Sequence, residues 1–258
     1  MKKILLLIII CLTIYSNLVV TAFDDIEDTS TIEAVITLAE FSIVKGYQDN
    51  TFKPHNNITR AEFSKIITET ILCSNNRIEE TQKFEDVDES LWANDYIYIA
   101  KGFGIINGTT ATTFEPEANI TYEQAIKMIV VALGYDIEAK EKGGYPNGYI
   151  AVANDLGILS DVKFNSADMT TRGNIAIIIR KTLDVPFYFL FNDGEAIQRE
   201  KSDLTLFELH TQSLIPISED KDTDEVEIES DSKTETDSEL FPDDGEILNA
   251  TDDSNTVG

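Results

Sequence analysis

One repeated position in the chain carries a charge that could bind an anion. Arg60 and Arg172 each follow a threonine, and each lies eight residues after a phenylalanine. The same spacing occurs once more between these two copies, where it leads from Phe114 to Tyr122 instead of to an arginine. A guanidinium group can hold a carboxylate through two parallel hydrogen bonds, so the position could recognise an acidic ligand. For Arg60 the alternative is an ion pair at the surface with a neighbouring acidic side chain.

The threonine before each of these residues predicts the start of a helix. Three threonines are each followed, three residues later, by a side chain that can bond back to the backbone: Thr59 and Glu62, Thr121 and Gln124, and Thr171 and Asn174. This spacing is typical of a capping box, and the third version is weaker because the Asn174 side chain is short. The helix macrodipole disfavours a cation in the first turn, so the two arginines need another reason to be there.

Each predicted helix has one apolar face. The apolar residues recur at helical spacing in all three copies: Phe63, Ile66, Ile67 and Ile71; Ala125, Met128, Ile129 and Leu133; and Ile175, Ile178, Ile179 and Leu183. Such a face predicts burial in a core rather than a ligand site. Three helices of this kind, packed around a common axis, would bury one another and leave the loops outside.

The unit that repeats is longer than one helix. In the first copy a helical pattern from Ile32 to Ala39 ends near Gly46, and a loop rich in turn-forming residues leads to Thr59. Each copy is therefore predicted to be a helix, a loop and a second helix. Because equivalent surfaces recur in a repeat protein, this organisation favours a binding module over an enzyme.

The N-terminal residues predict secretion. Lys2 and Lys3 precede an apolar stretch from Ile4 to Val20, and small residues end at Ala22. We interpret residues 1–22 as a signal peptide that is cleaved; the alternative is a retained membrane anchor. After cleavage Cys73 is the only cysteine, so we expect no internal disulfide and no cysteine-based metal or redox site.

The charge of the chain excludes some partners. The formal net charge is −27, which argues against binding to nucleic acid or to an anionic membrane surface. Residues 218–258 hold 16 acidic residues against two lysines and few large apolar side chains. We expect this acidic tail to be disordered, because it cannot bury enough surface to offset its conformational entropy.

Several motifs together resemble a known family. They are Gly46 to Pro54, Ile58 to Phe63, the Phe-x-Asp openings that contain Asp25 and Asp86, the pair Trp92 and Ala93, Gly104 to Gly108, and Gly143 to Tyr149. This pattern resembles the S-layer homology (SLH) domain, in triplicate and in a clostridial style. The resemblance divides the chain into a signal peptide (1–22), three repeats (23–79, 80–139 and 140–186), a post-repeat extension (187–217) and the tail (218–258).

The resemblance implies a fold and a function. The fold would be mainly α, with three helix-loop-helix repeats in a pseudo-threefold prism. Its function would be non-covalent anchoring to the bacterial cell wall through secondary cell-wall polysaccharide, with a pyruvylated sugar held in grooves between repeats. The candidate ligand-binding residues are Arg60, Arg172, Thr59, Glu62, Asp25, Asp86, Tyr122, Trp92, Gly46 and Gly108. No catalytic residue, metal ligand or cofactor is expected.

The candidates differ in how well they fit the family pattern. Tyr122 stands where the family has its hallmark arginine, so one groove is expected to be weak or lost. Asp161 replaces a glycine in the third copy, where the loop to the next phenylalanine is three residues shorter. Asp25 and Asp86 could line a groove or fix a loop, and the alternative, helix capping, is slightly favoured. For Trp92 the alternative is packing between helices, which we also favour.

Other functions find less support in the sequence. Neither histidine, His55 or His210, lies in a recognisable nucleophile motif, and no EF-hand spacing is present. The alternative to wall anchoring is an extracellular scaffold or surface-layer component whose acidic tail recruits a protein partner or Ca²⁺. Residues 187–191 are strongly apolar and predict a strand, and the extension is expected to dock on the repeats.

Overall fold

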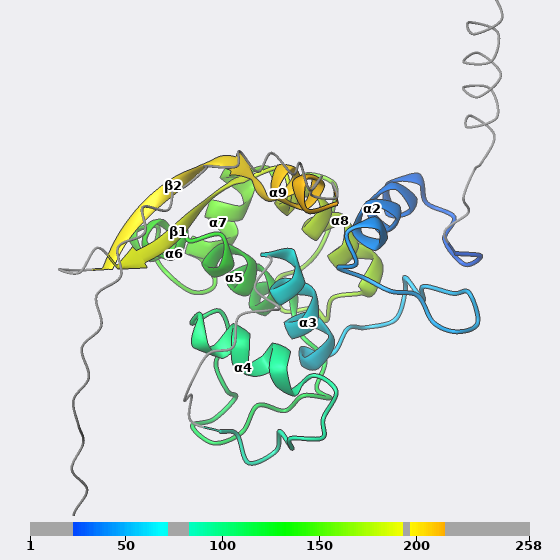
Figure 1. Cartoon of the computed structure of the whole chain (residues 1–258), viewed down its shortest axis with the longest axis horizontal. Helices are drawn as coiled ribbons and strands as arrows, with labels where there is room; N and C mark the ends of the chain where they lie inside the picture. Colours follow the sequence, from blue (N-terminus) through cyan, green and yellow to red (C-terminus); the bar gives the residue numbers. More distant parts are fainter. Residues whose placement is uncertain (1–22, 72–82, 193–196, 215–258) are drawn as a thin grey trace, which may run out of the picture. The chain divides into compact units, whose positions relative to one another are not determined.

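The computed structural model describes residues 23–71, 83–192 and 197–214, all within the contact unit Met1–Pro216 (Figure 1). The predicted signal peptide, Cys73 and the acidic tail lie outside these residues. The described chain is mainly helical, as the sequence predicts, with eight helices and a single pair of strands. Among the described helices, none combines the length and the apolar character needed to cross a lipid bilayer.

The helices and strands follow one another in the predicted order. Their bounds are α2 (Thr29–Glu40), α3 (Arg60–Thr70), α4 (Asn94–Gly102), α5 (Tyr122–Ala132), α6 (Asp136–Glu141), α7 (Asn147–Asp155), α8 (Arg172–Thr182), β1 (Pro186–Asn192), β2 (Ile197–Thr205) and α9 (Leu206–Ser213). The short helix α6 was not predicted, and it crosses the expected repeat boundary between residues 139 and 140.

The predicted caps are present at the starts of α3, α5 and α8. Thr59 and Thr121 each form a complete capping box with the glutamate or glutamine three residues on. Thr171 accepts a hydrogen bond from the Asn174 N–H, but no bond returns from the Asn174 side chain. The weaker third cap is thus confirmed, and all three helices begin at the residue that follows the threonine.

Three short extended segments join these helix starts in a ring. The Ile58 N–H donates to the Thr170 carbonyl, the Thr170 N–H to the Ile120 carbonyl, and the Ile120 N–H to the Ile58 carbonyl, at 3.0–3.1 Å. Isolated antiparallel bridges flank this ring. The backbone pairing therefore closes on itself and fixes the starts of α3, α5 and α8 beside one another.

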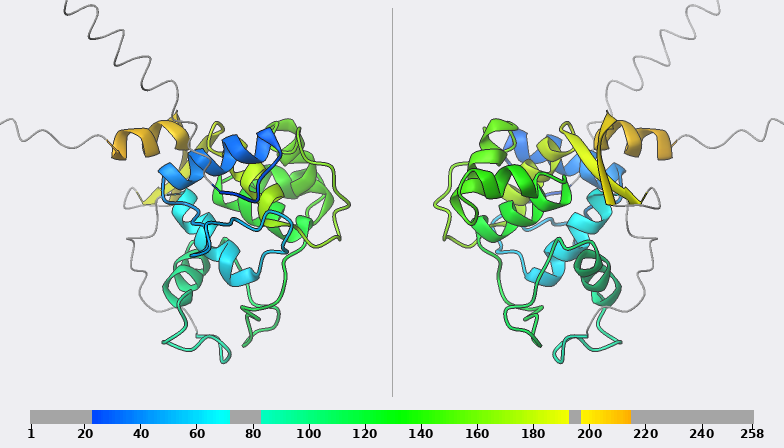
Figure 2. Two further views of the ribbon diagram at one scale, coloured as in Figure 1. Left: turned by 90° about the vertical axis from the view of Figure 1, so that its right-hand side faces the viewer. Right: turned by 90° about the vertical axis from the view of Figure 1, so that its left-hand side faces the viewer.

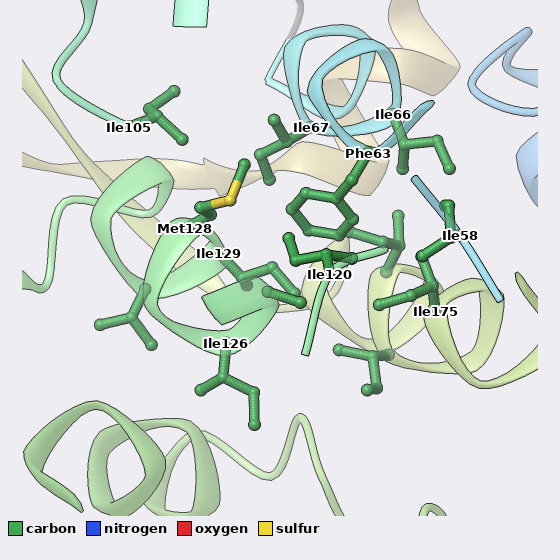
Figure 3. Close-up of a cluster of buried hydrophobic side chains, with 14 of the residues drawn as sticks. Ile58, Phe63, Ile66, Ile67, Ile105, Ile120, Ile126, Met128, Ile129 and Ile175 are labelled. Carbon is green, nitrogen blue, oxygen red and sulfur yellow. The ribbon is translucent and has the colours of Figure 1, made fainter. Parts of the chain in front are cut away.

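The core lies where the three capped helices meet. Figure 3 shows Phe63 of α3, Ile129 of α5 and Ile175 of α8 around Ile58 and Ile120. These five side chains are almost fully buried. The predicted apolar faces are confirmed, with only Ile71 at the end of the first stripe partly exposed. Burial of these faces supplies most of the stabilisation that a mainly helical fold of this size requires.

The remaining helices pack in a cyclic order. Helix α4 packs on α3, α7 packs on α5, and α2 packs on α8, although α2 and α8 are far apart in sequence. The first helix of one predicted repeat thus contacts the second helix of the copy before it. This order places the loop of one copy against the capped helix start of another.

The extension docks on the helical part, as predicted. The strands β1 and β2 pair antiparallel and lead directly into α9 (Figure 2). The Tyr188 N–H donates to the Leu133 carbonyl at 2.9 Å, and the Phe207 N–H donates to the Leu183 carbonyl at 2.8 Å. The Arg199 guanidinium pairs with Glu138 at 2.8 Å and lies over the Tyr188 ring.

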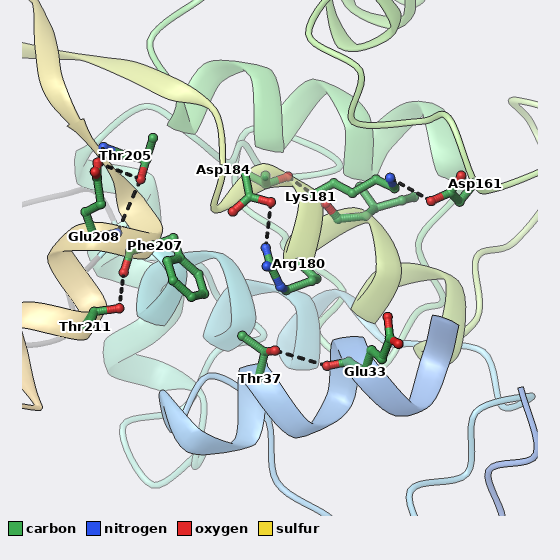
Figure 4. A network of polar contacts seen from close by, with 12 residues as sticks. Glu33, Thr37, Asp161, Arg180, Lys181, Asp184, Thr205, Phe207, Glu208 and Thr211 are labelled. Carbon is green, nitrogen blue, oxygen red and sulfur yellow. Dashed lines mark hydrogen bonds and ion pairs between the residues drawn. The ribbon is translucent and has the colours of Figure 1, made fainter. Parts of the chain in front are cut away.

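Helix α9 is anchored by polar and aromatic contacts. Its capping box joins Thr205 and Glu208, and Phe207 lies beneath the Arg180 guanidinium, which also pairs with Asp184 at 2.8 Å (Figure 4). His210 is buried, stacks on the Phe41 ring and lies 2.9 Å from the Thr70 carbonyl oxygen. The extension is therefore joined to α2, α3 and α8.

Candidate functional site

Two pockets of similar composition lie at equivalent places in the first and second copies. The Arg172 pocket, of about 170 Å³, is lined by Ile43, Val44, Lys45, Tyr47, Glu62, Lys65, Ile66, Trp92 and Arg172. The Arg60 pocket, of about 200 Å³, is lined by Ile105, Ile106, Asn107, Gly108, Thr109, Gln124, Lys127, Met128, Tyr145 and Arg60. Each combines an arginine, a loop, a lysine on a capped helix and an aromatic ring.

Arg60 is held by the backbone of the second copy. Its Nε donates to the Phe114 carbonyl at 2.7 Å and its Nη2 to the Asn107 carbonyl at 3.0 Å. The guanidinium also lies 4.4 Å from the centre of the Phe114 ring. With only 8% of the residue exposed, burial lowers the pKa of Arg60 from its ordinary value, although Glu115 and Asp86 oppose this. The surface ion pair that we considered for Arg60 is therefore wrong.

Arg172 makes the corresponding contacts with the first copy. Its Nε donates to the Phe52 carbonyl at 3.0 Å and its Nη2 to the Lys45 carbonyl at 3.4 Å. A further nitrogen, Nη1, pairs with Glu62 at 3.2 Å. The two arginines thus bind loops that are 47 to 127 residues away in the sequence, and both tie one copy to the next.

A lysine on a capped helix adds positive charge to each of the two pockets, Lys65 of α3 to the Arg172 pocket and Lys127 of α5 to the Arg60 pocket. Lys65 and Lys127 both lie six residues after the capping threonine. Burial lowers the pKa of the Lys65 ammonium, and the nearby charges of Lys45 and Arg172 lower it further, while Glu69 opposes them. An anion in the pocket would relieve this repulsion. The sequence analysis missed both lysines, although their common spacing from the threonine was a usable signal.

An aromatic side chain lies at the edge of each pocket. Trp92 is 54% exposed and lines the Arg172 pocket, so the packing role that we favoured for it is wrong. Tyr145, which the analysis did not select, is 48% exposed at the Arg60 pocket. Its hydroxyl donates to Glu123 at 2.9 Å. Burial, followed by this carboxylate, raises the pKa of Tyr145 to about 12.

In the second copy, Tyr122 occupies the position equivalent to Arg60 and Arg172, and its environment is different. Tyr122 is buried and stacks on the Phe164 ring, with 4.8 Å between the ring centres. Its hydroxyl contacts the Asn174 side chain. The residue six positions after the third threonine is Ile177, not a lysine. This position therefore has neither of the two cationic side chains that the other two have.

Asp25 and Asp86 fix loops rather than helix ends. The Asp25 carboxylate accepts hydrogen bonds from the Phe52 and Lys53 N–H groups at 2.8 and 2.7 Å. Asp86 does the same for the Phe114 and Glu115 N–H groups at 2.8 and 2.6 Å. The helix cap of α2 is Asp28 instead. The capping role that we favoured for these two aspartates is therefore wrong, and neither lines the Arg172 pocket or the Arg60 pocket.

The remaining candidates have structural contacts. A side chain at Gly46 would meet the Phe23 ring at 1.9 Å, and one at Gly108 would meet backbone oxygens at 2.4 Å. Thr59 caps α3, and its hydroxyl accepts from the Glu62 N–H. Gly108 and Glu62 also line a pocket, whereas Gly46 and Thr59 do not. Asp161 pairs with Lys181 at 2.6 Å (Figure 4).

The described residues contain no group of three histidine, cysteine or acidic side chains placed to hold a metal ion. The two pockets share three kinds of side chain. Each presents a fixed guanidinium, a lysine ammonium and an exposed aromatic ring, and guanidinium and ammonium groups form strong hydrogen bonds with carboxylates.

Comparison with known proteins agrees with this arrangement. Residues 22–64 and 83–126 match the S-layer homology domain. Two segments of the chain thus match this family model. The first matched segment holds the loop and the helix start of the Arg172 pocket and ends one residue before Lys65, and the second holds those of the Arg60 pocket and ends one residue before Lys127.

Related proteins are found at the surface of bacterial cells. The chain is 28% identical over 186 residues to a cell surface protein of Thermoanaerobacter kivui, covering 70% of this chain and 23% of that protein. It is 30% identical over 164 residues to a surface layer protein of Brevibacillus choshinensis, covering 61% and 14%. It is 32% identical over 112 residues to a cellulosome-anchoring protein of Acetivibrio thermocellus, covering 42% and 25%.

These matches concern a part of each relative. The chain spans about a quarter or less of the length of these three proteins. The location predicted from the sequence, a secreted protein at the cell surface, is confirmed by the domain match and by the relatives.

Proposed function

We propose that this chain attaches non-covalently to the bacterial cell wall by binding an anionic secondary cell-wall polysaccharide in the Arg172 and Arg60 pockets. The SLH match and the relationship to a cellulosome-anchoring protein support attachment to the wall. The observation that carries the choice of site is the pairing of a fixed arginine with a lysine and an aromatic ring in two equivalent pockets.

A sugar that carries a pyruvate ketal fits these groups. Its carboxylate would meet the guanidinium and the ammonium, which form strong charge-assisted hydrogen bonds with carboxylates. Its ring would lie against Trp92 or Tyr145, both of which are about half exposed. The pockets are far too small for a polymer, so each would take one sugar residue of the chain.

The proposal includes a third repeat, residues 140–186. Its support is the closed hydrogen-bonded ring, in which Thr170 takes the place that Ile58 and Ile120 take in the two matched segments. The packing of α2 on α8 closes the circle of helices in the same way. We propose that the interface at Tyr122 in this ring binds no anion, because it has neither an arginine nor a lysine.

The test is co-sedimentation of the chain from Phe23 onward with native cell-wall sacculi, before and after acid extraction of the polysaccharide. We expect binding that disappears after extraction. Lys65→Met and Lys127→Met together should abolish most of the binding without disturbing the contacts of the buried arginines. Lys201→Met, at an exposed lysine of β2, is the matched control and should bind like the unchanged chain.

Three results would contradict the proposal. Equal binding to extracted sacculi would place the receptor in peptidoglycan. Normal binding by the double lysine variant would move the site away from the pockets. Absence of binding to either kind of sacculus would leave the extracellular scaffold as the better account of the chain.

A further inference from the structure

The two pockets differ at one residue beside the arginine. Glu62 and Gln124 occupy the same position in their capping boxes, and each uses one oxygen to accept from the N–H of the capping threonine, at 2.9 and 3.2 Å. The second terminal atom is the one that differs. In Glu62 it is a carboxylate oxygen, whereas in Gln124 it is an amide nitrogen that can only donate.

This difference changes the state of the guanidinium. The Glu62 carboxylate oxygen takes Nη1 of Arg172, so all three guanidinium nitrogens of Arg172 have partners. Arg60 has partners for Nε and Nη2 only, and within the described chain its Nη1 bonds to no other residue. Nη1 of Arg60 is also not one of the side-chain atoms that are both buried and without a hydrogen-bond partner. Nη1 of Arg60 is thus open to solvent and available to a ligand.

The total charge of the two pockets does not distinguish them. The Arg172 pocket is lined by Arg172, Lys45, Lys65 and one carboxylate, and the Arg60 pocket by two cations and no carboxylate. Both therefore have a formal charge of about +2 when all groups are ionised. The distinction lies in where the negative charge is. In the Arg172 pocket the Glu62 carboxylate is already bound to the guanidinium, so a ligand carboxylate would have to share that guanidinium with Glu62.

We infer that the two pockets have unequal affinity for a carboxylate-bearing sugar, that the Arg60 pocket is the stronger, and that the residue three positions after the capping threonine sets this ranking. The inference rests on the proposed function. A carboxylate entering the Arg60 pocket meets a free guanidinium N–H and a lysine. One entering the Arg172 pocket meets the Glu62 charge within hydrogen-bond distance of the same guanidinium, and the two like charges repel each other.

The inference is tested by exchanging the two residues. Glu62→Gln removes the charge from the Arg172 pocket, and Gln124→Glu introduces it into the Arg60 pocket. Both variants keep a residue that completes a capping box, because both residue types do so in this chain. Neither exchange is therefore expected to prevent folding, which thermal unfolding of each variant checks.

The measurement is an NMR titration that follows each pocket separately. The probe is the methyl glycoside of pyruvylated N-acetylmannosamine. The backbone amides of Gly108 and Thr109 report on the Arg60 pocket, and those of Lys45 and Tyr47 on the Arg172 pocket. In the unchanged chain the Arg60 pocket should saturate at about three- to tenfold lower probe concentration. Glu62→Gln should raise the affinity of the Arg172 pocket by a similar factor, and Gln124→Glu should lower that of the Arg60 pocket.

The outcomes separate the inference from the proposed function. Equal affinities in the unchanged chain, or exchanges without effect, would overturn the inference and leave the proposed function intact. If neither set of amides responds to the probe in any variant, the proposed function itself is wrong and the inference falls with it. The glycoside without pyruvate is the matched control, and its binding should be indifferent to both exchanges because it carries no charge.

Discussion

Arg60 and Tyr122 occupy the same position in two copies of one unit, and they perform the same packing with different chemistry. Each begins a capped helix and is almost fully buried. Each also stacks on a phenylalanine of the next copy, Arg60 on Phe114 and Tyr122 on Phe164. The guanidinium of Arg60 reaches two carbonyl oxygens, whereas the phenol of Tyr122 reaches one side-chain amide.

The comparison separates the packing role of the arginine from the anion-binding role that we propose for it. The joining of copies needs a long, flat side chain that stacks and forms hydrogen bonds, and a tyrosine can supply it. Anion binding additionally needs positive charge, which tyrosine lacks. The interface at Tyr122 also has Ile177 where the other two interfaces have Lys65 and Lys127. It therefore lacks the positive charge of the lysine as well as that of the arginine. Of the four predictions below, the first two test this separation of roles and the last two test the backbone ring and the extension, beginning with the largest expected effect.

The arginines should be needed for stability whether or not a ligand is present. Arg172→Ala removes three hydrogen bonds and leaves the Phe52 and Lys45 carbonyls without this donor. We expect a loss of about 3–5 kcal/mol in the free energy of unfolding, measured by urea denaturation. Lys83→Ala, at the exposed ion pair with Glu89, is the control and should leave the free energy of unfolding almost unchanged. Equal losses would mean that Arg172 does not tie the copies together.

The pocket lysines should be needed for binding but not for stability. Lys65→Met and Lys127→Met together should weaken wall binding about 30-fold or more, because each removes a charge-assisted contact with the ligand. Lys65→Met also removes the hydrogen bond that the Lys65 ammonium donates to the Ile43 carbonyl at 3.1 Å, so the free energy of unfolding should fall by about 1 kcal/mol, far less than for Arg172→Ala. Each single variant should lose less, because the other pocket still holds the polymer. A stability loss as large as that of Arg172→Ala would contradict the separation of roles.

The hydrogen-bonded ring has a defect in the third copy. Ile58 and Ile120 fill two of its positions, and Thr170 fills the third with a buried hydroxyl that has no hydrogen-bond partner in the described chain. Thr170→Val keeps the shape and removes the unsatisfied group. It should raise the free energy of unfolding by about 1–2 kcal/mol in urea denaturation. A loss of stability would show that the hydroxyl is satisfied, and Ile120→Thr should produce the opposite change.

The extension should make stability depend on pH. Burial lowers the pKa of His210 in the folded chain, although the Thr70 carbonyl and Glu69 oppose this. The unfolded chain therefore binds the proton more readily, and folding stability should fall as the pH drops below the ordinary histidine pKa of about 6.5, until the folded pKa is reached. His210→Phe should reduce this dependence in denaturation curves measured at pH 5 and pH 7.5. An unchanged slope would assign it to other groups.

The sequence alone determined the local structure of the repeats. The capping boxes, the apolar faces of α3, α5 and α8, and the strand at residues 187–191 all depend on neighbouring residues and were predicted correctly. The same regular spacing identified Arg60 and Arg172 as special, and it identified Tyr122 as their exception. Hydrophobic periodicity and capping are short-range effects, so a single sequence reports them well.

Only the tertiary structure decided how these parts combine. Each pocket takes its arginine from one copy, its loop and lysine from another, and its aromatic ring from the start of the following one, so no stretch of sequence contains it. The exposure of Trp92, the loop contacts of Asp25 and Asp86, and the pairing of Glu62 with Arg172 all depend on contacts between distant segments. These contacts form because the ring of backbone hydrogen bonds and the packing of α2 on α8 close the chain on itself.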